Sequence, residues 1–526
     1  MGTQVGVGAE QASSEIRRGV GAIVGVLAAG VALGTAELLS AVFGPGSSPI
    51  VAVGGAAVDA TPEWLKSFAI RTFGEHDKRV LLIGICVVLG IAVALVGAAS
   101  WRRPSLAIGA SVLLGAIGAA AAVTRPANDL SDAVPSIAGA AAGAFTSRLL
   151  MAAAGVPTGS PAETPSSPVM RSFDRRRFLR AGVAAAGIAT AAGGLGRLLS
   201  SRATAAASRA AALIPTPADI GPPPPAGADL GVPGVAPFLT PNATFYRVDT
   251  ALFVPALDAE SWALRVHGMV DHEITLGFDD LLARPMIERD ITIACVSNEV
   301  GGPYVGNARW IGAPLADLLR EAGVHPAASQ IVSRSSDGFT IGTPTAVVMD
   351  GRDAMLAVSM NGEPLPLEHG FPVRMLVPGL YGYVSAMKWL VELELTTLDA
   401  YDAYWIERGW AKEAPVKTQS RIDTPGSRAQ LAPGLVPVAG VAWAQHRGID
   451  RVEVRVDDGA WEPAELGVED TIDTWRQWVY RWEATPGSHA LAVRATDGEG
   501  ETQTEETVPP FPDGATGHHT ILVDVI

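Results

Sequence analysis

The sequence predicts three structural parts: an N-terminal α-helical membrane domain, a mixed α+β domain and a C-terminal all-β sandwich of immunoglobulin type. Runs rich in Ala, Gly, Val and Leu fall within roughly the first 200 of the 526 residues. After them strand and helix signals alternate, and from about Pro415 onward only short strands and turns follow. We therefore divide the chain into 1–200, 201–239, 240–400 and 401–526. The second of these is an Ala- and Pro-rich linker, whose composition predicts a semi-rigid tether.

The first part contains five apolar segments suited to crossing a membrane. A spanning helix requires ~20 mostly apolar residues. Four segments come close to this length, and a fifth at Ala181–Leu199 is less apolar. The four are Val20–Phe43, Val80–Ser100, Leu106–Val123 and Ala133–Ala154. Glu37 is an acid near the outer end of the first, where an interfacial structural role is favoured over a redox role.

Arginine clusters predict the orientation of these segments. One cluster precedes the first segment, one separates the second from the third, and one precedes the fifth. They are Arg17 and Arg18, Arg102 and Arg103, and Arg171 with Arg175, Arg176, Arg177 and Arg180. Because loops rich in Lys and Arg stay in the cytoplasm, and these loops alternate, the N-terminus is expected inside. Everything after about Ser200 is then expected outside.

The third arginine cluster also resembles a twin-arginine export signal. The motif Asp174-Arg-Arg-Arg-Phe-Leu-Arg180 lies inside the chain and is followed by a mildly apolar Ala/Gly run. Such signals are typical of proteins exported in folded form, often with a cofactor already inserted. The alternative is a plain basic anchor on the cytoplasmic side of a span. The twin-arginine interpretation predicts a prosthetic group in the exported part.

Strand and helix patterns alternate in the α+β part. Strands are expected at Trp262–His267, Val373–Val377 and Trp389–Leu395. Apolar residues spaced three and four apart predict a helix at 315–322, directly after a Gly-Ala-Pro turn. Both element types therefore belong to one mixed domain.

Alternating apolar residues and Asx-Gly turns predict the C-terminal sandwich. The expected strands are Val452–Val456, Trp478–Trp482, Leu491–Val493 and Ile521–Val523. Because no helical period occurs among them, two packed sheets of immunoglobulin type are the favoured arrangement.

Cys295 is the most informative single residue. The only other cysteine, Cys86, lies in an apolar segment, so Cys295 has no disulfide partner nearby and must be free, reactive or ligating. A lone cysteine is ordinarily a small buried apolar residue. Here Ile291, Ile293 and Cys295 alternate with smaller residues, which predicts that the thiol lies at the end of a strand, before a Gly- and Asn-rich loop. Strand ends that open into loops commonly present functional side chains.

Five segments occur together in an order that resembles the sulfite oxidase family of molybdenum-cofactor enzymes. They are Cys295 with its loop, Asn361–Pro366, His369–Arg374, Val377–Gly379 and Ser385–Trp389. The resemblance extends over about Thr240–Ile526, and the membrane half looks like that of actinobacterial membrane-anchored members. It implies a sulfite-oxidase-type molybdopterin-binding domain, followed by a dimerisation-type sandwich through which the chain could form a homodimer.

The resemblance also implies the residues of the site. Cys295 would be the thiolate ligand of the molybdenum, a role that suits a soft sulfur donor. The cofactor phosphate would be held by the side chains of His369, Arg374 and Lys388. The backbone of Ala386 and Met387 would assist. Asn242, Tyr246 and Arg247 match a region near the cofactor and substrate, where Arg247 would clamp an oxyanion. Asp337 matches an aspartate that contacts the pterin.

Trp410 departs from the pattern of the family. Aligning Trp405 and Arg408 with the family places Trp410 where sulfite oxidases have a tyrosine near the metal. Without the phenol one hydrogen-bond donor to an oxyanion is lost, so the alignment weakens sulfite as the expected substrate.

These observations predict an extracytoplasmic, membrane-anchored molybdenum-cofactor oxidoreductase that transfers an oxygen atom to or from a small sulfur or nitrogen oxo compound, such as sulfite or a sulfoxide. The chain contains no Cys-x-x-Cys-His haem motif and no further cysteines for an iron–sulfur cluster. A separate redox partner is therefore expected: a cytochrome, a quinone or a membrane haem protein. The formal net charge of −15 argues against a nucleic-acid partner. The alternative is a cofactor-free, membrane-tethered binding or scaffold protein that kept the fold.

Overall fold

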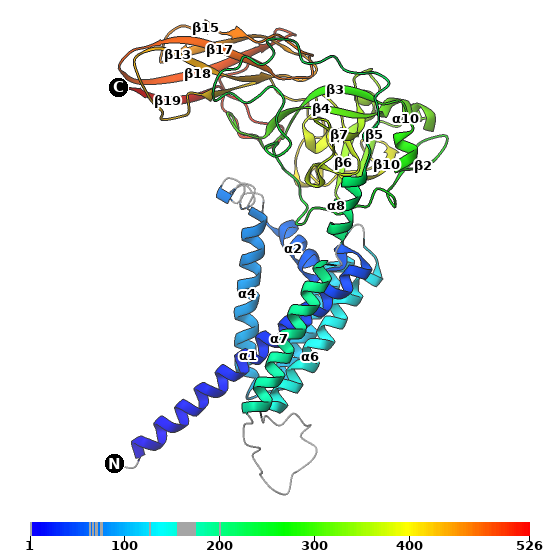
Figure 1. The fold of residues 1–526 in the computed structure, drawn as a ribbon, viewed down its shortest axis with the longest axis vertical. Coiled ribbons are helices and arrows are strands. Elements are labelled where there is room, and N and C mark those ends of the chain that lie inside the picture. The colour runs from blue at the N-terminus through cyan, green and yellow to red at the C-terminus, as the bar shows by residue number, and fades with distance from the viewer. Residues whose placement is uncertain are drawn as a thin grey trace. The chain divides into compact units, whose positions relative to one another are not determined.

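The computed structural model (Figure 1) describes residues 3–62, 65, 68, 72, 73, 77–125, 128–154, 175–198 and 201–526. It consists of two compact units, Met1–Ala203 with Ala251–Val254, and Thr204–Thr250 with Pro255–Ile526. The first unit contains the apolar helices, and the second contains the sheets. Arg171 and Asp174 of the third arginine cluster lie outside the described residues.

The first unit consists of helices, as its composition predicts. They are α1 Thr3–Phe43, α2 Pro49–Ala60, α4 Asp77–Ser100, α5 Ser105–Val123, α6 Val134–Ala153 and α7 Arg175–Leu198. Within the described residues, five helical segments are long and apolar enough to cross a membrane. These are Glu15–Phe43, Val80–Ser100, Ser105–Val123, Leu130–Ala153 and Arg176–Leu195. They overlap the five expected segments, although Leu199, the expected end of the fifth, lies outside the described residues.

Small residues let the helices of this unit approach closely. A Cβ added to Gly21 of α1 would lie 2.4 Å from the carbonyl oxygen of Gly97 in α4, so only glycine fits at this crossing. Close contact through small residues is a common way for helices to associate in membranes. At the other end of α1, Glu37 accepts a 2.6 Å hydrogen bond from Ser48, the residue that caps α2.

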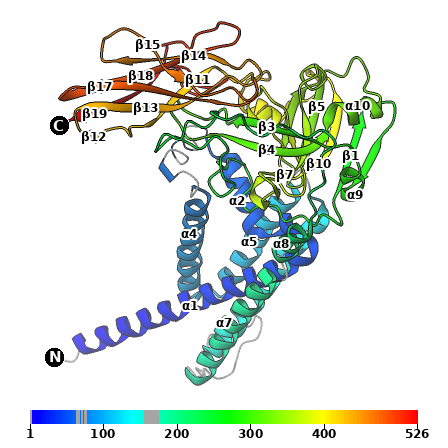
Figure 2. The same cartoon turned by 45° about the horizontal axis from the view of Figure 1, so that its top comes forward.

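The second unit begins with an α+β domain built on two five-stranded sheets (Figure 2). The first sheet has the order β2-β1-β10-β5-β6, and the second has the order β3-β4-β7-β8 with β9 paired to β7. The strands of the first are β1 Ala263–Gly268, β2 Ile274–Gly277, β5 Gln330–Ser335, β6 Thr340–Pro344 and β10 Leu390–Thr396. Those of the second are β3 Ile287–Ala294, β4 Val305–Pro314, β7 Met355–Met360, β8 Glu363–Pro364 and β9 Arg374–Leu376.

Short helices connect these strands. They are α9 Phe278–Leu282, α10 Leu315–Ala322, α11 Thr345–Val348 and α12 Gly382–Ser385. The expected helix at 315–322 is α10, whose apolar face is buried and which ends at Gly323 with φ +68°. The expected strands correspond to β1, β9 and β10, each within one or two residues.

The segment expected to be a tether is instead ordered against the α+β domain. It begins with helix α8 Ser201–Ala211, and Ala228 and Phe238 are buried in the core of that domain. The Phe238 carbonyl accepts hydrogen bonds from Asn307 Nδ2 at 3.0 Å and from Trp475 Nε1 at 2.9 Å. Prolines favour an extended backbone, but here apolar side chains between them supply enough buried surface to fix that backbone in place.

The C-terminal domain consists of two sheets with one core between them. Their orders are β11-β13-β17-β16 and β12-β19-β18-β14-β15. The strands are β11 Gln419–Thr424, β12 Gln430–Leu431, β13 Gly434–Trp443, β14 Ile449–Val456, β15 Glu462–Pro463, β16 Glu465–Leu466, β17 Arg476–Ala484, β18 Gly487–Asp497 and β19 His519–Val525. All four expected strands lie within β14, β17, β18 and β19. The first strand of the C-terminal domain, β11, begins at Gln419, later than the expected domain boundary at 401. Trp410, Ala414 and Val416, which precede it, pack into the core of the α+β domain.

Residues of the C-terminal domain form hydrogen bonds with strand β3. The buried Thr292 of β3 accepts a 2.7 Å hydrogen bond from the Trp475 backbone N–H on its hydroxyl, and its own N–H donates to the Asp473 carbonyl at 2.9 Å. Gln445 Nε2 donates to the Thr292 carbonyl at 3.2 Å. The strand that leads to Cys295 is therefore held by both domains.

Candidate functional site

Cys295 directly follows the last residue of β3, as the alternating pattern predicts. Its backbone N–H donates to the Tyr304 carbonyl at 3.0 Å, which closes the loop after the strand. Its Sγ lies 3.0 Å from Ser297 Oγ, and the thiol is free. Burial raises the pKa of the Cys295 thiol, whereas hydrogen bonding with Ser297 and the positive charge of Lys388 lower it. A cation in the surroundings favours the thiolate, the form that ligates metals.

Arg374 on β9 is a charged side chain in the interior, with only 4% of its surface exposed. Its Nη1 donates to the His369 carbonyl at 3.2 Å, and its guanidinium lies 5.1 Å from the centre of the Trp310 ring. Burial lowers the pKa of Arg374 to about 10. Among the described residues its Nε has no hydrogen-bond partner. A buried cation with a spare donor suits an anion that the chain itself does not supply.

Lys388 is the second cation of the site, with 11% of its side chain exposed. Its Nζ donates to Asp249 Oδ2 at 2.7 Å and approaches the Glu368 carbonyl at 3.4 Å. Burial lowers the pKa of Lys388 to about 8, although Asp249 opposes this shift. The next residue, Trp389, has φ +54°, a conformation that is strained for a large side chain. The indole N–H of Trp389 donates to the Leu367 carbonyl at 2.8 Å, which holds this backbone in place.

His369 is a buried, neutral histidine whose carbonyl accepts the hydrogen bond from Arg374. Burial lowers the pKa of His369 to about 3, and the charges of Arg374 and Lys388 act in the same direction. Its Nε2 is 3.3 Å from the Asn242 carbonyl, so a neutral ring with hydrogen on Nε2 donates to that oxygen. Gly370, at φ +112°, makes the tight turn possible, since a Cβ there would lie 3.1 Å from both Arg374 Cβ and Lys388 Cα.

The segment from Asn242 to Asp249 lies beside the same residues. Asn242 is fixed by Asn361, whose Nδ2 donates to Asn242 Oδ1 at 2.9 Å. The Tyr246 ring is 6.3 Å from the Tyr304 ring, and burial raises the pKa of its hydroxyl, with Cys295 adding to the rise. Arg247 Nε donates to Asp249 Oδ2 at 2.8 Å. Asp249 therefore connects Arg247 to Lys388.

Three of the expected residues make other contacts. Asp337 is exposed on the turn between β5 and β6, where it accepts a hydrogen bond from Phe339 N–H at 3.2 Å and so caps its own turn. The Ala386 N–H donates to the Gly382 carbonyl at 3.0 Å. The Met387 carbonyl accepts from the Met375 N–H at 2.8 Å. These groups stabilise local structure.

Trp410 belongs to a cluster of aromatic rings. Its ring lies 5.8 Å from Tyr383, 6.2 Å from Trp405 and 5.4 Å from Phe511. It is buried, and its Nε1 has no hydrogen-bond partner among the described residues. No contact found in the described part of the chain links it directly to Cys295.

Two residues near the site were missed from the sequence. Asp249 accepts hydrogen bonds from both Arg247 and Lys388, and Tyr381 is buried close enough to Cys295 for the thiolate to raise the pKa of its hydroxyl, beyond the rise caused by burial. Asp249 follows Arg247 by two residues, a spacing that offered a local signal. Tyr381 offered none beyond its place after the Val377–Gly379 motif.

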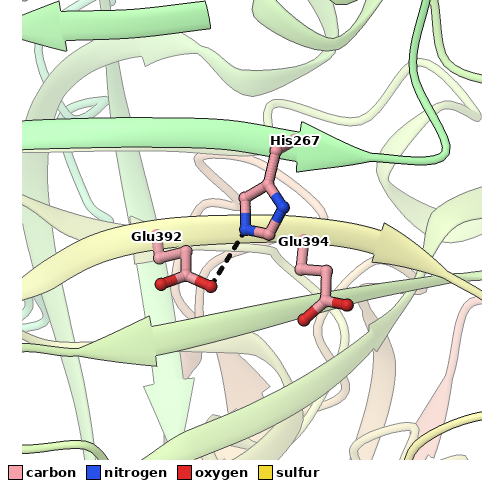
Figure 3. Close-up of side chains that lie close together, drawn as sticks. All are labelled: His267, Glu392 and Glu394. Carbon is pink, nitrogen blue, oxygen red and sulfur yellow. Dashed lines mark hydrogen bonds and ion pairs between the residues drawn. The ribbon is translucent and has the colours of Figure 1, made fainter. Parts of the chain in front are cut away.

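A separate cluster of potential ligands lies on β1 and β10. His267, Glu392 and Glu394 (Figure 3) are the one group of three such side chains close enough for a metal ion within the described ranges. His267 Nε2 is 2.9 Å from Glu392, and Arg334 lies 3.6 Å from Glu392 and 4.0 Å from Glu394. Because Arg334 already neutralises the carboxylates, we interpret the cluster as an ion-pair network.

The residues around Cys295 fit the cofactor that the resemblance implies. A thiol without a disulfide partner offers a soft ligand to a metal. The buried Arg374, with its spare Nε donor, and the largely buried Lys388 offer charge and a hydrogen bond to a phosphate. Lys388 connects these groups: its Nζ donates to Asp249, and its charge lowers the pKa of both Cys295 and His369.

Comparisons with known proteins identify the family of this chain. Residues 251–405 match the family described as oxidoreductase molybdopterin binding domain. Mitochondrial sulfite oxidase of Mus musculus is 30% identical over 321 residues, which cover 52% of this chain and 58% of the mouse protein. The chain thus spans little more than half the length of that relative. The uncharacterized oxidoreductase YuiH of Bacillus subtilis is 35% identical over 153 residues, or 29% of this chain and 74% of YuiH. The crystal structure of the sulfane dehydrogenase SoxCD from Paracoccus pantotrophus is 23% identical, covers 55% of this chain and 84% of its own, and has a TM-score of 0.48.

Proposed function

Because the chain belongs to the sulfite oxidase family of molybdopterin-dependent oxidoreductases, we propose that it transfers an oxygen atom to or from a small sulfur or nitrogen oxo compound. The observation that carries this proposal is Cys295, a free thiol at a strand end that lies within the electrostatic reach of a buried lysine. When bound, the molybdenum cofactor supplies two-electron oxygen-atom transfer. The chain itself supplies the ligand, the phosphate cradle and the substrate contacts.

Each residue of the site then has a distinct role. Cys295 holds the metal through its thiolate. Arg374 and Lys388 hold the phosphate, and neutral His369 adds a hydrogen-bonding group without further charge. Arg247, whose side chain is 31% exposed, is the group nearest to solvent among these cations and contacts the substrate.

Electrons leave or enter through a separate redox partner. The full sequence holds two cysteines and no Cys-x-x-Cys-His motif, so neither an iron–sulfur cluster nor a c-type haem site accompanies the cofactor on this chain. A cytochrome, a quinone or a membrane haem protein fills this role.

The α+β domain and the C-terminal domain lie outside the cytoplasm, anchored by the five apolar helices. Alternate arginine-rich loops support this orientation, and Arg175–Arg180 at the start of α7 resemble a twin-arginine signal.

A reporter fused after Ile526 is expected to be active outside the cytoplasm. Replacing Arg175 and Arg176 by Lys is expected to block export. A cytoplasmic signal from the reporter would contradict the orientation. Normal export of the double-lysine variant would contradict only the twin-arginine interpretation.

We also infer an immunoglobulin-type arrangement for the two C-terminal sheets and a homodimer formed through them. Sedimentation of the detergent-purified chain at the mass of a monomer would contradict the dimer.

Trp410 is expected to disfavour sulfite and to favour a substrate with an organic arm. Its indole brings apolar area and one donor in place of a phenol hydroxyl. Trp410→Tyr should raise kcat/KM for sulfite by ~10–100-fold, the effect of one hydrogen bond to a charged group, and should change sulfoxide turnover less. Steady-state kinetics with sulfite and with a dialkyl sulfoxide measures both effects.

Trp405→Tyr is the matched control, since Trp405 lies in the same aromatic cluster. It should leave the ratio of the two activities unchanged. Efficient sulfite oxidation by the wild type that Trp410→Tyr does not alter would show that Trp410 has no contact with the substrate.

A further inference from the structure

Asp249 is a buried carboxylate that joins Arg247, the proposed substrate contact, to Lys388, a proposed phosphate contact. Its side chain is 5% exposed. Oδ2 accepts from Lys388 Nζ at 2.7 Å and from Arg247 Nε at 2.8 Å, and Oδ1 lies 3.4 Å from Arg247 Nη2. The carboxylate thus lies along the Nε and Nη2 edge of the guanidinium, the edge that commonly binds oxyanions through two parallel hydrogen bonds.

An oxyanion at Arg247 has to compete with this carboxylate. Asp249 is two residues away in the same chain, so its effective concentration at the guanidinium is far above that of any solute. A sulfite or sulfate ion would also come close to a buried negative charge, which repels it at low local dielectric. A sulfoxide or N-oxide meets neither obstacle, because it is neutral and needs only one donor on its oxygen.

We propose that Asp249 is a specificity-determining residue that excludes free oxyanions and reserves the site for neutral sulfur or nitrogen oxides. This inference rests on the proposed function and names its substrate class. For a sulfoxide, the net reaction breaks the S–O bond, takes two electrons from the redox partner and two protons from water, and releases the sulfide and one water molecule. Asp249 takes no part in this bond breaking, and it acts through the charge that it places beside Arg247 and Lys388.

Asp249→Asn tests the proposal, because it removes the charge and keeps the shape of the side chain. The purified full chain is assayed with a dialkyl sulfoxide and reduced viologen, and with sulfite and ferricyanide. Sulfate serves as a competing anion in the assays and as the titrant in calorimetry, which reads anion binding without turnover. We expect sulfate to bind at least ~10-fold more tightly to the variant than to the wild type, a change that equals ~1.4 kcal/mol. The kcat/KM for sulfite should rise by a similar factor, while the KM for the sulfoxide changes by less than ~3-fold.

Glu453→Gln is the matched control. Glu453 likewise joins two cations, with Oε2 2.9 Å from Arg494 Nε and 3.6 Å from Arg451 Nε and a side chain 13% exposed, but it lies on β14 of the C-terminal domain. This variant should leave sulfate binding at the wild-type level. Asp249→Glu, which retains the charge, should retain the exclusion of sulfate. Asp249→Ser, which removes the charge, should no longer exclude sulfate. It provides a second test if the Asn variant fails to fold.

The outcomes separate the inference from the proposed function. Wild-type protein without molybdenum or turnover would overturn the proposed function. Wild-type protein with molybdenum and sulfoxide turnover, combined with unchanged sulfate binding in Asp249→Asn and Asp249→Ser, would overturn only the role of Asp249. Loss of molybdenum in both variants would also overturn this role, because it would assign Asp249 to holding the cofactor.

Discussion

Cys295→Ser is expected to abolish turnover while the protein still folds. Serine is close to cysteine in size, so the backbone bond to Tyr304 and the contact with Ser297 can persist. Its hydroxyl, however, stays protonated at neutral pH and cannot replace the thiolate that Cys295 would offer to the metal. Residues that only support a metal ligand cost ~10–100-fold when changed, and loss of the ligand itself should exceed that range. Steady-state turnover, with molybdenum content measured on the same sample, checks this expectation.

Cys86→Ser is the control for this variant. Cys86 is the other cysteine of the chain and is exposed on α4, in the unit of apolar helices. The variant should have wild-type turnover. Full activity of Cys295→Ser would exclude Cys295 as the metal ligand and would remove the main support for the proposed site.

Arg374→Met is expected to have opposite effects on cofactor binding and on stability. No carboxylate among the described residues pairs with this cation, and burial lowers its pKa to about 10. Keeping the guanidinium charged in the interior therefore costs folding free energy. Replacing a buried charge by an apolar side chain of similar volume is often neutral or stabilising by ~1–4 kcal/mol. Without cofactor, the variant should therefore unfold at a higher temperature than the wild type. With molybdate supplied, it should lose most of its molybdenum, since a charged hydrogen bond of ~1.5–3 kcal/mol disappears.

Thermal unfolding of proteins produced without molybdate, and metal analysis of proteins produced with it, measure the two effects. Arg265→Met is the control, because Arg265 is half-exposed on β1 and pairs with Glu273 at the surface. It should change neither quantity by much. An Arg374→Met variant that keeps its molybdenum, or that melts below the wild type when both lack cofactor, would contradict the role of Arg374 as a cation held ready for an anion.

The elements that could be predicted from the sequence are those with a local sequence pattern. The alternation before Cys295 predicted the end of β3, the three- and four-residue spacing predicted α10, and the Asx-Gly turns marked the strands of the C-terminal domain. Apolar length alone predicted the five long helices. Each of these signals lies within one element, so no knowledge of the rest of the fold was needed.

The features that escaped prediction depend on contacts between distant parts of the chain. Asp249 and Lys388 are 139 residues apart, and no local pattern shows that they meet. The 212–239 segment looks like a linker by composition, but its few apolar residues pack into a core that other segments build.

Molybdenum analysis of the purified protein decides whether Cys295 holds a molybdenum cofactor. We expect about one molybdenum atom per chain in active protein, held through Cys295 and lost in Cys295→Ser. A folded protein that contains no molybdenum when molybdate is available, as a cofactor-free scaffold does, or one that turns over substrate without the metal, would contradict the proposed function.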